Sequence, residues 1–260
     1  MKRYRLTVAY DGSNYHGWQE QSNGITIESV LNETLSRILK EEIHVIGASR
    51  TDAGVHAYGN IAVFDSETRI PADKICYAIN PHLPADIRIM RSEEVDADFH
   101  PRYRDSRKTY EYHIYNSRIP FPTNRLYSHQ VIMPLDVEAM QEAGKYIVGS
   151  HDFKAFCAAK AQVKTTVRTV NAVRVKKSPM SDEIIIEVQG EGFLYNMVRI
   201  IGGTLIKVGL HAYPAEHVKE IIESLDRSQA GETLPARGLF LQKIEYVDFS
   251  GETGRKEDSL

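Results

Sequence analysis

The sequence predicts an α+β protein of two tandem ferredoxin-like (RRM-like) βαββαβ units, whose antiparallel sheets merge into one sheet with the helices on one face. Stretches with alternating apolar residues, typical of half-buried strands, take turns with stretches whose apolar residues recur at helical spacing. The same order of elements occurs twice along the 260 residues, a length that suits one large domain or two small fused ones.

The first repeat opens on a strand over 4–10, where apolar residues alternate with polar ones. A helix follows over 27–39, with apolar residues at helical spacing and Thr26 as its N-cap. Two strands are expected near 43–49 and 59–64. A helix that begins at Pro71, because proline suits the first helical turn, and a strand near 87–90 complete the repeat.

The second repeat shows the same succession. We expect a strand over 110–114, a helix over 137–147, strands near 167–175 and 184–188, and a helix within 193–208. A further helix starting at Pro214 and a last strand over 239–246 follow. The expected organisation is one unit over 1–103, a second over 104–249 and a disordered polar tail over 250–260.

The composition excludes several classes of protein. Lys and Arg number 32 against 35 Asp and Glu, for a net charge of -3, which excludes a uniformly basic nucleic-acid coat protein but allows a local basic groove. The two cysteines, Cys76 and Cys157, cannot build a disulfide framework or a cysteine zinc site. Because no stretch approaches the ~18 apolar residues of a membrane span, we expect a cytoplasmic protein without a membrane partner.

Two stretches are locally basic. Residues 160–177 hold six Lys or Arg and no acid, and residues 102–125 hold six cations against Asp105 and Glu111. Such stretches are either solvated strand and loop faces or a groove for RNA, which a few phosphate contacts suffice to bind. The second stretch interleaves its cations with tyrosines, and aromatic rings beside cations are how proteins hold unpaired bases, so the pattern favours RNA. These tyrosines are Tyr103, Tyr110, Tyr112 and Tyr115.

Common catalytic motifs are missing from the sequence. It contains no GxxxxGK[ST] phosphate loop, no HExxH pair and no GxSxG elbow. Nucleotide-driven, zinc-dependent and serine-hydrolase chemistries therefore lose support, and no metal or nucleotide cofactor is expected.

A candidate catalytic carboxylate follows an expected strand. Arg50, Thr51 and Asp52 come at its end, and Gly54 frees the backbone for a turn. The carboxylate of Asp52 is ionised at neutral pH and can act as nucleophile or base. The alternative is an Asx turn, in which Asp52 makes only local hydrogen bonds.

A second candidate is an arginine within an apolar helix. Gly202 and Gly203 lie three and four positions after Arg199, on its face of the helix, so another backbone or a ligand can approach the guanidinium. The alternative is an exposed arginine on an ordinary amphipathic helix. A buried Arg199 would need an anionic partner, for which Asp52 in the other half is the candidate.

Seven blocks of the sequence resemble the tRNA pseudouridine synthase A (TruA) family. The resemblance runs in matching order from about Tyr4 to Phe249. The most specific block is Arg-Thr-Asp-Ala-Gly-Val-His-Ala at 50–57, and the others lie at 10–12, 17–19, 108–112, 151–153, 193–199 and 238–241.

The resemblance implies a homodimer that converts uridine to pseudouridine at positions 38, 39 and 40 of the tRNA anticodon stem-loop without a cofactor. It implies that Asp52 is the nucleophile and Arg199 its ion-pair partner. Whether Asp52 attacks C1′ or removes a ribose proton stays open. The competing interpretation is a non-catalytic RNA-binding protein on the same scaffold. In the pocket, Tyr110 would stack on the target base and could assist loss of its C5 proton, Arg50 would help hold the flipped base, and Leu239 would form an apolar wall.

Overall fold

The computed structural model describes residues 1–158 and 163–247. The chain divides into two compact units. Of the described residues, unit 1 comprises 1–107 and 243–247, and unit 2 comprises 108–158 and 163–242. The expected tail over 250–260 and Lys160 of the basic stretch lie outside the described residues.

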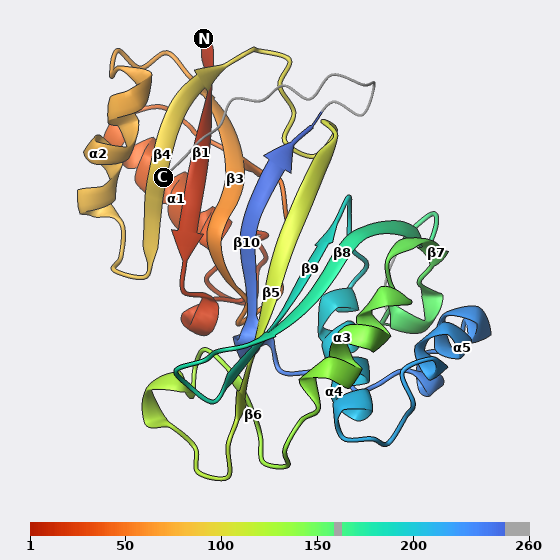
Figure 1. The fold of residues 1–260 in the computed structure, drawn as a ribbon. Helices are drawn as coiled ribbons and strands as arrows, with labels where there is room; N and C mark the ends of the chain where they lie inside the picture. The colour runs from red at the N-terminus through yellow and green to blue at the C-terminus, as the bar shows by residue number, and fades with distance from the viewer. Residues whose placement is uncertain (159–162, 248–260) are drawn as a thin grey trace. The chain divides into compact units, whose positions relative to one another are not determined.

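Unit 1 contains an antiparallel sheet in the order β4-β1-β3, with β2 paired to β3 (Figure 1). The side chains of β1 alternate between buried and half-buried along the strand, as the alternation of apolar residues predicts. α1 crosses one face of the sheet. The elements are β1 (Lys2–Tyr10), α1 (Ile27–Leu39), β2 (Ile46–Gly47), β3 (His56–Ser66), α2 (Ile75–Ile79) and β4 (Ile87–Val95).

The start of α1 confirms the expected cap. The Thr26 side chain accepts a hydrogen bond from the backbone N–H of Ser29, and the Ser29 side chain accepts one from the backbone N–H of Thr26. This reciprocal pair satisfies two N–H groups that the helix itself leaves without partners. The helix buries Ile27, Leu31 and Leu35, which form its apolar face.

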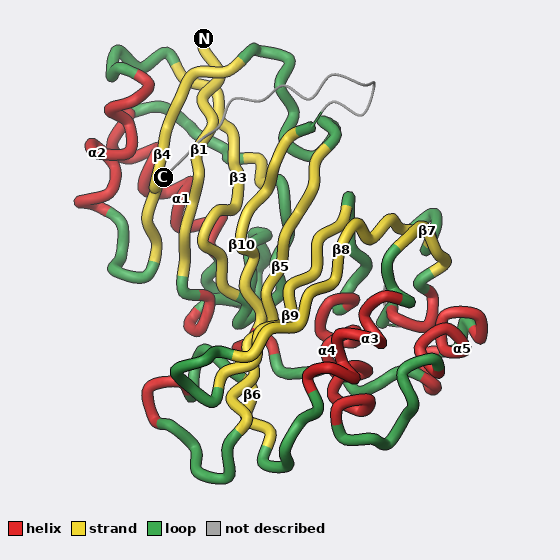
Figure 2. Tube along the Cα trace, in the orientation of Figure 1, coloured by secondary structure: helices red, strands yellow, loops and turns green. Residues whose placement is uncertain are grey.

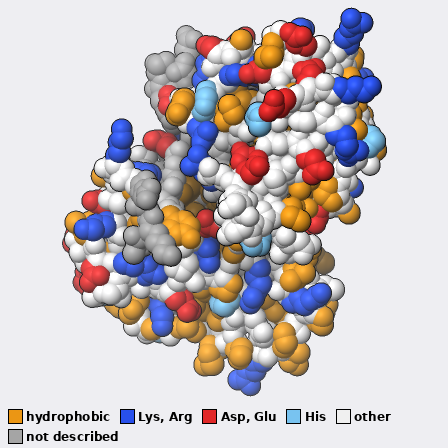
Figure 3. All heavy atoms as spheres, turned by 180° about the vertical axis from the view of Figure 1, so that it is seen from behind, with side chains coloured by type: hydrophobic (Ala, Val, Ile, Leu, Met, Phe, Trp, Pro, Cys, Tyr) orange, Lys and Arg blue, Asp and Glu red, His pale blue; other side chains and the backbone are white. Residues whose placement is uncertain are grey.

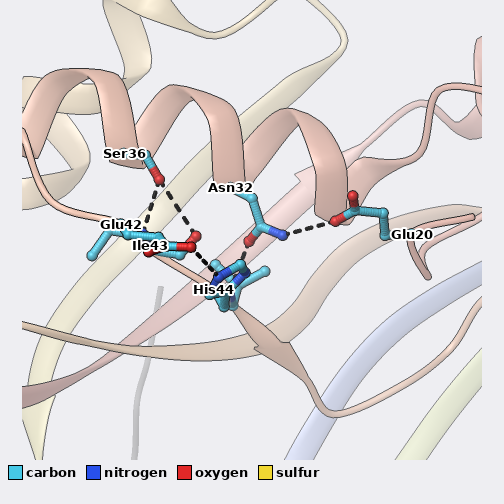
Figure 4. A network of polar contacts seen from close by, with 7 residues as sticks. Glu20, Asn32, Ser36, Glu42, Ile43 and His44 are labelled. Atoms are coloured by element: carbon cyan, nitrogen blue, oxygen red, sulfur yellow. Dashed lines mark hydrogen bonds and ion pairs between the residues drawn. The ribbon is translucent and has the colours of Figure 1, made fainter.

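The strand expected over 43–49 is much shorter, because side chains of α1 take two of its backbone N–H groups. Ile43 N–H donates to Ser36 Oγ over 2.9 Å, and Val45 N–H donates to Asn32 Oδ1 over 2.8 Å (Figure 4). A backbone group engaged in this way cannot join a strand ladder. Only Ile46–Gly47 pairs with β3 in this segment.

The α-helix expected to begin at Pro71 begins at Ile75. A 3₁₀ turn over Ala72–Lys74 follows Pro71 directly, and α2 continues from it to Ile79. A second 3₁₀ turn over Asn80–His82 follows α2 and contains Pro81, which has no N–H to donate to a continued α-helix.

Unit 2 contains strands in the order β5-β9-β8-β7, each antiparallel to its neighbour, with β6 parallel to β5. α3 packs on β8 and against α4. Figure 2 separates the strands from the helices and loops. The elements are β5 (Ser106–Asn116), β6 (His129–Val131), α3 (Val137–Lys145), β7 (Gly149–Asp152), β8 (Val167–Lys177), β9 (Glu183–Gly190), α4 (Met197–Gly209), α5 (His217–Ser224) and β10 (Leu239–Tyr246).

Two helices of unit 2 begin later than expected. α4 starts at Met197 because Asn196, its N-cap, has a left-handed backbone with φ of 62°, so the chain turns there and Phe193 lies ahead of the helix. α5 starts at His217, three residues after Pro214. The last strand, β10, has the expected limits, and it has residues in both units. The fold is mixed α/β, as the sequence predicts.

Candidate active site

Asp52 lies in the loop that joins β2 to β3 in unit 1. Its side chain is half-buried, whereas the preceding Thr51 is buried. Val55 N–H donates to the Asp52 carbonyl over 3.1 Å, which closes a tight turn. Gly54 has φ of +78° within this turn, a conformation that favours glycine. The expected glycine turn is therefore observed, but β2 ends at Gly47, so Asp52 lies within the loop and not at the end of a strand.

A buried network of hydrogen-bonded polar side chains fixes the start of the loop that contains Asp52. The Tyr10 and Thr51 hydroxyls are 2.7 Å apart and hydrogen-bonded. Asn60 Nδ2 donates to the Ser49 carbonyl over 2.9 Å and to the Tyr10 hydroxyl over 3.3 Å. Fully satisfied polar networks of this kind fix a single backbone path. The network therefore fixes the backbone on the N-terminal side of Asp52.

The segment around Gly17 packs against the same loop. Trp18 N–H donates to the Thr51 carbonyl over 3.0 Å. Gly17 has φ of +89°, and a Cβ there would lie 2.6 Å from the Thr51 carbonyl oxygen. A side chain at position 17 is therefore excluded by both strain and contact. The blocks at 10–12 and 17–19 thus support the Asp52 loop.

Arg50 stands two residues before Asp52 and is exposed.

Tyr110 lies in the middle of β5 in unit 2, opposite Val188 of β9. Its side chain is 7% exposed. The ring meets Phe193 edge to face, with centroids 5.3 Å apart and an interplanar angle of 88°. This geometry is a favourable one for two aromatic rings, so Phe193 fixes the orientation of the Tyr110 ring.

Arg199 projects from the first turn of α4 and is half-buried. Its Nε donates to the Leu234 carbonyl and its Nη1 to Asn196 Oδ1, each over 2.6 Å. Because two of its nitrogens are held in this way, the plane of the guanidinium is fixed.

The paired glycines of α4 admit another backbone. A Cβ on Gly203 would lie 2.1 Å from the Glu232 carbonyl oxygen. Gly231 N–H donates to Thr204 Oγ1 over 2.9 Å, so the segment over 231–234 lies directly on the helix. The sequence allowed either another backbone or a ligand to approach α4 at its two glycines, and the structure shows another backbone there. The same segment includes the Leu234 carbonyl that accepts a hydrogen bond from Arg199.

Leu239 is the first residue of β10 and is 6% exposed. It follows a 3₁₀ turn over Ala236–Gly238. The neighbouring Tyr112 is fully buried and donates its hydroxyl to the Pro235 carbonyl over 2.8 Å. Burial raises the pKa of Tyr112 above its ordinary value. The interpretation of Tyr112 as a base-stacking residue is therefore wrong, and its ring instead supports the turn that leads to Leu239.

The basic stretches are partly neutralised. Arg174 pairs with Glu187 across β8 and β9, and Arg104 pairs with Asp98 over 3.3 Å. Partial burial lowers the pKa of Arg168, whose Nη1 donates to backbone carbonyls. Several other cations are exposed, namely Arg102, Arg118, Arg125, Lys164, Lys176 and Lys177.

Within 1–158 and 163–247, no three His, Cys, Asp or Glu side chains gather in a way that could hold a metal ion. In the same part of the chain, no helix is long and apolar enough to cross a bilayer.

The sequence named Asp52, Arg50, Tyr110, Arg199 and Leu239 but missed the residues that position them. Thr51, Asn60, Phe193, Asn196 and Leu234 each contact one of these segments. Their partners are distant in sequence in most cases, so the one available signal was that Thr51, Phe193 and Asn196 belong to the same blocks as candidate residues.

Comparison with known proteins assigns the chain to a family. The sequence profile described as tRNA pseudouridine synthase matches residues 6–104 and 143–247. A protein named tRNA pseudouridine synthase A from Thermoanaerobacter sp. (strain X514) is 45% identical over 246 residues, which cover 95% of this chain and 100% of that protein. Its namesake from Ruminiclostridium cellulolyticum is 50% identical over 248 residues, with 95% and 100% covered.

A solved structure titled "Structure of H/ACA RNP bound to a substrate RNA containing 2'-deoxyuridine" aligns over 96% of this chain and 50% of its own. At 11% identity and a TM-score of 0.32, it carries no weight in the assignment. The profile and the full-length relatives suffice: this chain belongs to the tRNA pseudouridine synthase family.

Proposed function

We propose that the protein isomerises uridine to pseudouridine in tRNA. The observation that carries the proposal is the family match, whose first segment, 6–104, includes the Asp52 loop. In this reaction the bond between ribose C1′ and uracil N1 breaks, the base turns, and C1′ bonds to C5. The C5 proton leaves and N1 takes up a proton. The atoms balance without an oxidant, a reductant or a transferred group, so the proposed reaction needs no cofactor.

Asp52 is the proposed catalytic carboxylate. Breaking the glycosidic bond develops positive charge on the ribose, which a carboxylate can stabilise or capture, as in glycosidases. The network beneath the loop supports this role, because a reacting group must be held in a productive position. Attack on C1′ and removal of a ribose proton are both compatible with a carboxylate here.

Four further residues complete the proposed site. Arg199 acts in the reaction as the cationic partner of Asp52; its fixed guanidinium plane supports this role. Tyr110 stacks on the target uracil, and its orientation by Phe193 supports that assignment. The exposed side chain of Arg50 helps hold the flipped base, and Leu239 gives an apolar wall that retains the detached uracil.

The proposed targets are the uridines at positions 38, 39 and 40 of the anticodon stem-loop. A base in a stem must be extruded before reaction, at a cost of a few kcal/mol that other contacts offset. On the face seen in Figure 3, Lys and Arg side chains are spread among acidic ones. We therefore expect tRNA phosphates to meet local groups of exposed cations, such as Lys176 and Lys177, in place of one uniformly basic surface.

We further propose that both halves are variants of the ferredoxin-like unit, with the domains at 1–103 and 104–249. The strand orders support this. The strands of unit 1 follow the antiparallel order β4-β1-β3-β2, and the order β5-β9-β8 of unit 2 repeats the order β1-β3-β2. A tRNA substrate places the reaction in the cytoplasm.

A homodimer is the proposed assembly. The segment over 117–133 of unit 2 exposes several large apolar side chains, and exposed apolar groups close together mark interaction surfaces. A second copy of this chain is the occupant that the family resemblance implies. We expect sedimentation to give a mass twice that of the 29.5 kDa chain. Ile132→Asp should reduce this mass to that of a single chain. A single-chain mass for the unaltered protein would exclude the dimer. The side chains are Ile119, Phe121, Leu126, Tyr127, Ile132 and Met133.

The function is tested by incubating the purified protein with unmodified tRNA transcripts and mapping pseudouridine by carbodiimide labelling and primer extension. We expect stops that mark positions 38, 39 and 40 in transcripts that carry uridine there. Binding of tRNA without any mass-neutral change in uridine would instead identify a non-catalytic RNA-binding protein.

A further inference from the structure

The turn between β4 and β5 presents a stacked pair of rings at the surface of unit 1. The rings of His100 and Tyr103 lie 3.9 Å apart between centroids, with an interplanar angle of 15°. Tyr103 is 83% exposed, which leaves the face away from His100 open to solvent. Exposed aromatic rings of this kind are the surfaces on which unpaired bases stack.

Backbone hydrogen bonds fix the pair in place. The His100 carbonyl accepts from the N–H groups of Tyr103 and Arg104, over 3.2 and 3.3 Å. His100 Nδ1 accepts from Arg102 N–H over 3.3 Å, so the neutral ring carries its proton on Nε2. Partial burial and the charge of Arg102 also lower the pKa of His100. The ring beneath Tyr103 is therefore neutral at physiological pH.

A second aromatic and cationic layer anchors the turn to β1. Phe99 meets Tyr246 edge to face at 5.0 Å, and the Arg5 guanidinium lies 5.9 Å from both ring centroids. The Tyr246 hydroxyl donates to the Pro101 carbonyl over 3.0 Å, and Arg3 Nη1 donates to the Phe99 carbonyl over 3.0 Å. These contacts fix the turn that carries the stacked pair, while the Tyr103 ring itself remains 83% exposed.

The stacked pair lies far from the Asp52 loop along the sheet of unit 1. Arg3, which holds Phe99, pairs with Val95 at one end of β1, and Tyr10, which holds Thr51, pairs with Ala57 at the other. Tyr10 follows Arg3 by seven positions along the strand, which amounts to roughly 23 Å. A ligand on the stacked pair therefore does not reach the reacting uridine.

We propose that His100, Arg102 and Tyr103 form an accessory RNA site, called here the stacking platform, that binds an unpaired tRNA nucleotide other than the target. The base stacks on the open face of Tyr103, and the exposed guanidinium of Arg102 contacts a neighbouring phosphate. The proposal rests on the proposed function, because it takes tRNA as the substrate. It assigns the platform to binding and not to the chemical step.

The test compares Tyr103→Ala with Tyr103→Phe, which keeps the ring, and with Tyr77→Ala, which removes a tyrosine that is 70% exposed on α2 of the same unit. For Tyr103→Ala we expect KM for full-length tRNA to rise about tenfold, with the single-turnover rate at saturating tRNA unchanged. Tyr103→Phe and Tyr77→Ala stay within about twofold of the unaltered protein. Arg102→Ala reduces the slope of log affinity against log salt by about one.

An unchanged KM in Tyr103→Ala would overturn the proposal, as would an equal rise in Tyr77→Ala. An equal rise in Tyr103→Phe would also overturn it, because the hydroxyl and not the ring would then be responsible. Melting temperatures equal to that of the unaltered protein show that the variants fold. Failure of the proposed function is distinct: in that case the unaltered protein itself forms no pseudouridine.

Discussion

The edge of one ring meets the face of the other where Tyr110 and Phe193 pack together, 5.3 Å between centroids and at 88°. Tyr110 lies on β5 and Phe193 in the turn ahead of α4, so the contact joins a strand to a helix start. The ring proposed to stack on the target base is thereby prevented from turning.

Phe193→Ala should lower kcat/KM by about 2- to 10-fold, because edge-to-face ring pairs contribute ~0.5–1.5 kcal/mol. Phe193→Tyr keeps the ring and should retain most of the activity. Steady-state rates of pseudouridine formation check both variants. Equal losses in the two variants would show that the ring contact with Tyr110 is irrelevant.

Thr51→Val removes the hydrogen bond to Tyr10 while keeping the shape of the side chain. We expect a loss of about 1 kcal/mol in unfolding free energy and a fall in kcat of about tenfold, because the Asp52 loop shifts. Tyr10→Phe breaks the same bond. If this hydrogen bond positions the loop, the variant with both substitutions loses less kcat than the two single losses multiplied together, because each change removes the same bond. Fully additive effects on the activation free energy would contradict the assignment.

Gly203→Ala should destabilise unit 2, because its Cβ would lie 2.1 Å from the Glu232 carbonyl oxygen. Overpacking of this kind costs ~1–3 kcal/mol. Gly192→Ala is the matched control, since its Cβ would meet only the Arg168 side chain at 3.9 Å. Chemical denaturation of the two variants should give a lower unfolding free energy for Gly203→Ala alone. Equal stabilities would mean that the segment over 231–234 does not hold against α4.

His129 makes stability depend on pH. Burial first, and the charge of Arg237 second, lower its pKa in the folded protein. When the pH falls below about 6.5, the ordinary pKa of histidine, His129 therefore takes up a proton more readily in the unfolded chain than in the folded protein. The unfolding free energy decreases as the pH falls through this range. His129→Gln removes this contribution. Melting temperatures at pH 7.5 and 5.5 should differ less in His129→Gln than in the unaltered protein; an equal difference would contradict the account.

The fold was predictable wherever local pattern and packing agree. Alternation in β1 and the Thr26 cap of α1 both appear as expected, because each depends on residues adjacent in sequence. β6 and β7 were missed, since three or four largely polar residues at the side of a sheet carry no periodicity. β2 was overextended because the hydrogen bonds that the Ser36 and Asn32 side chains accept from the N–H groups of Ile43 and Val45 are contacts between a helix and a loop, which no strand pattern reveals.

In the candidate site, the sequence indicated the proposed reacting residues but not the residues that position them. Asp52 and Arg199 stood out as a carboxylate before a glycine turn and an arginine beside paired glycines. Their supports did not, because the hydrogen bond between Tyr10 and Thr51 spans 41 residues and the one between Arg199 and Leu234 spans 35. A single sequence gives no sign of which polar side chains meet over such separations.

The Asp52 carboxylate is the group that we propose carries the chemistry. The most direct measurement follows tritium release from tRNA labelled at uridine C5, with Asp52→Asn compared against Asp73→Asn, an exposed aspartate of the same unit. The account predicts no release by Asp52→Asn, tRNA affinity within a few-fold of the unaltered protein, and full release by Asp73→Asn. Release by Asp52→Asn at the rate of the unaltered protein would contradict it.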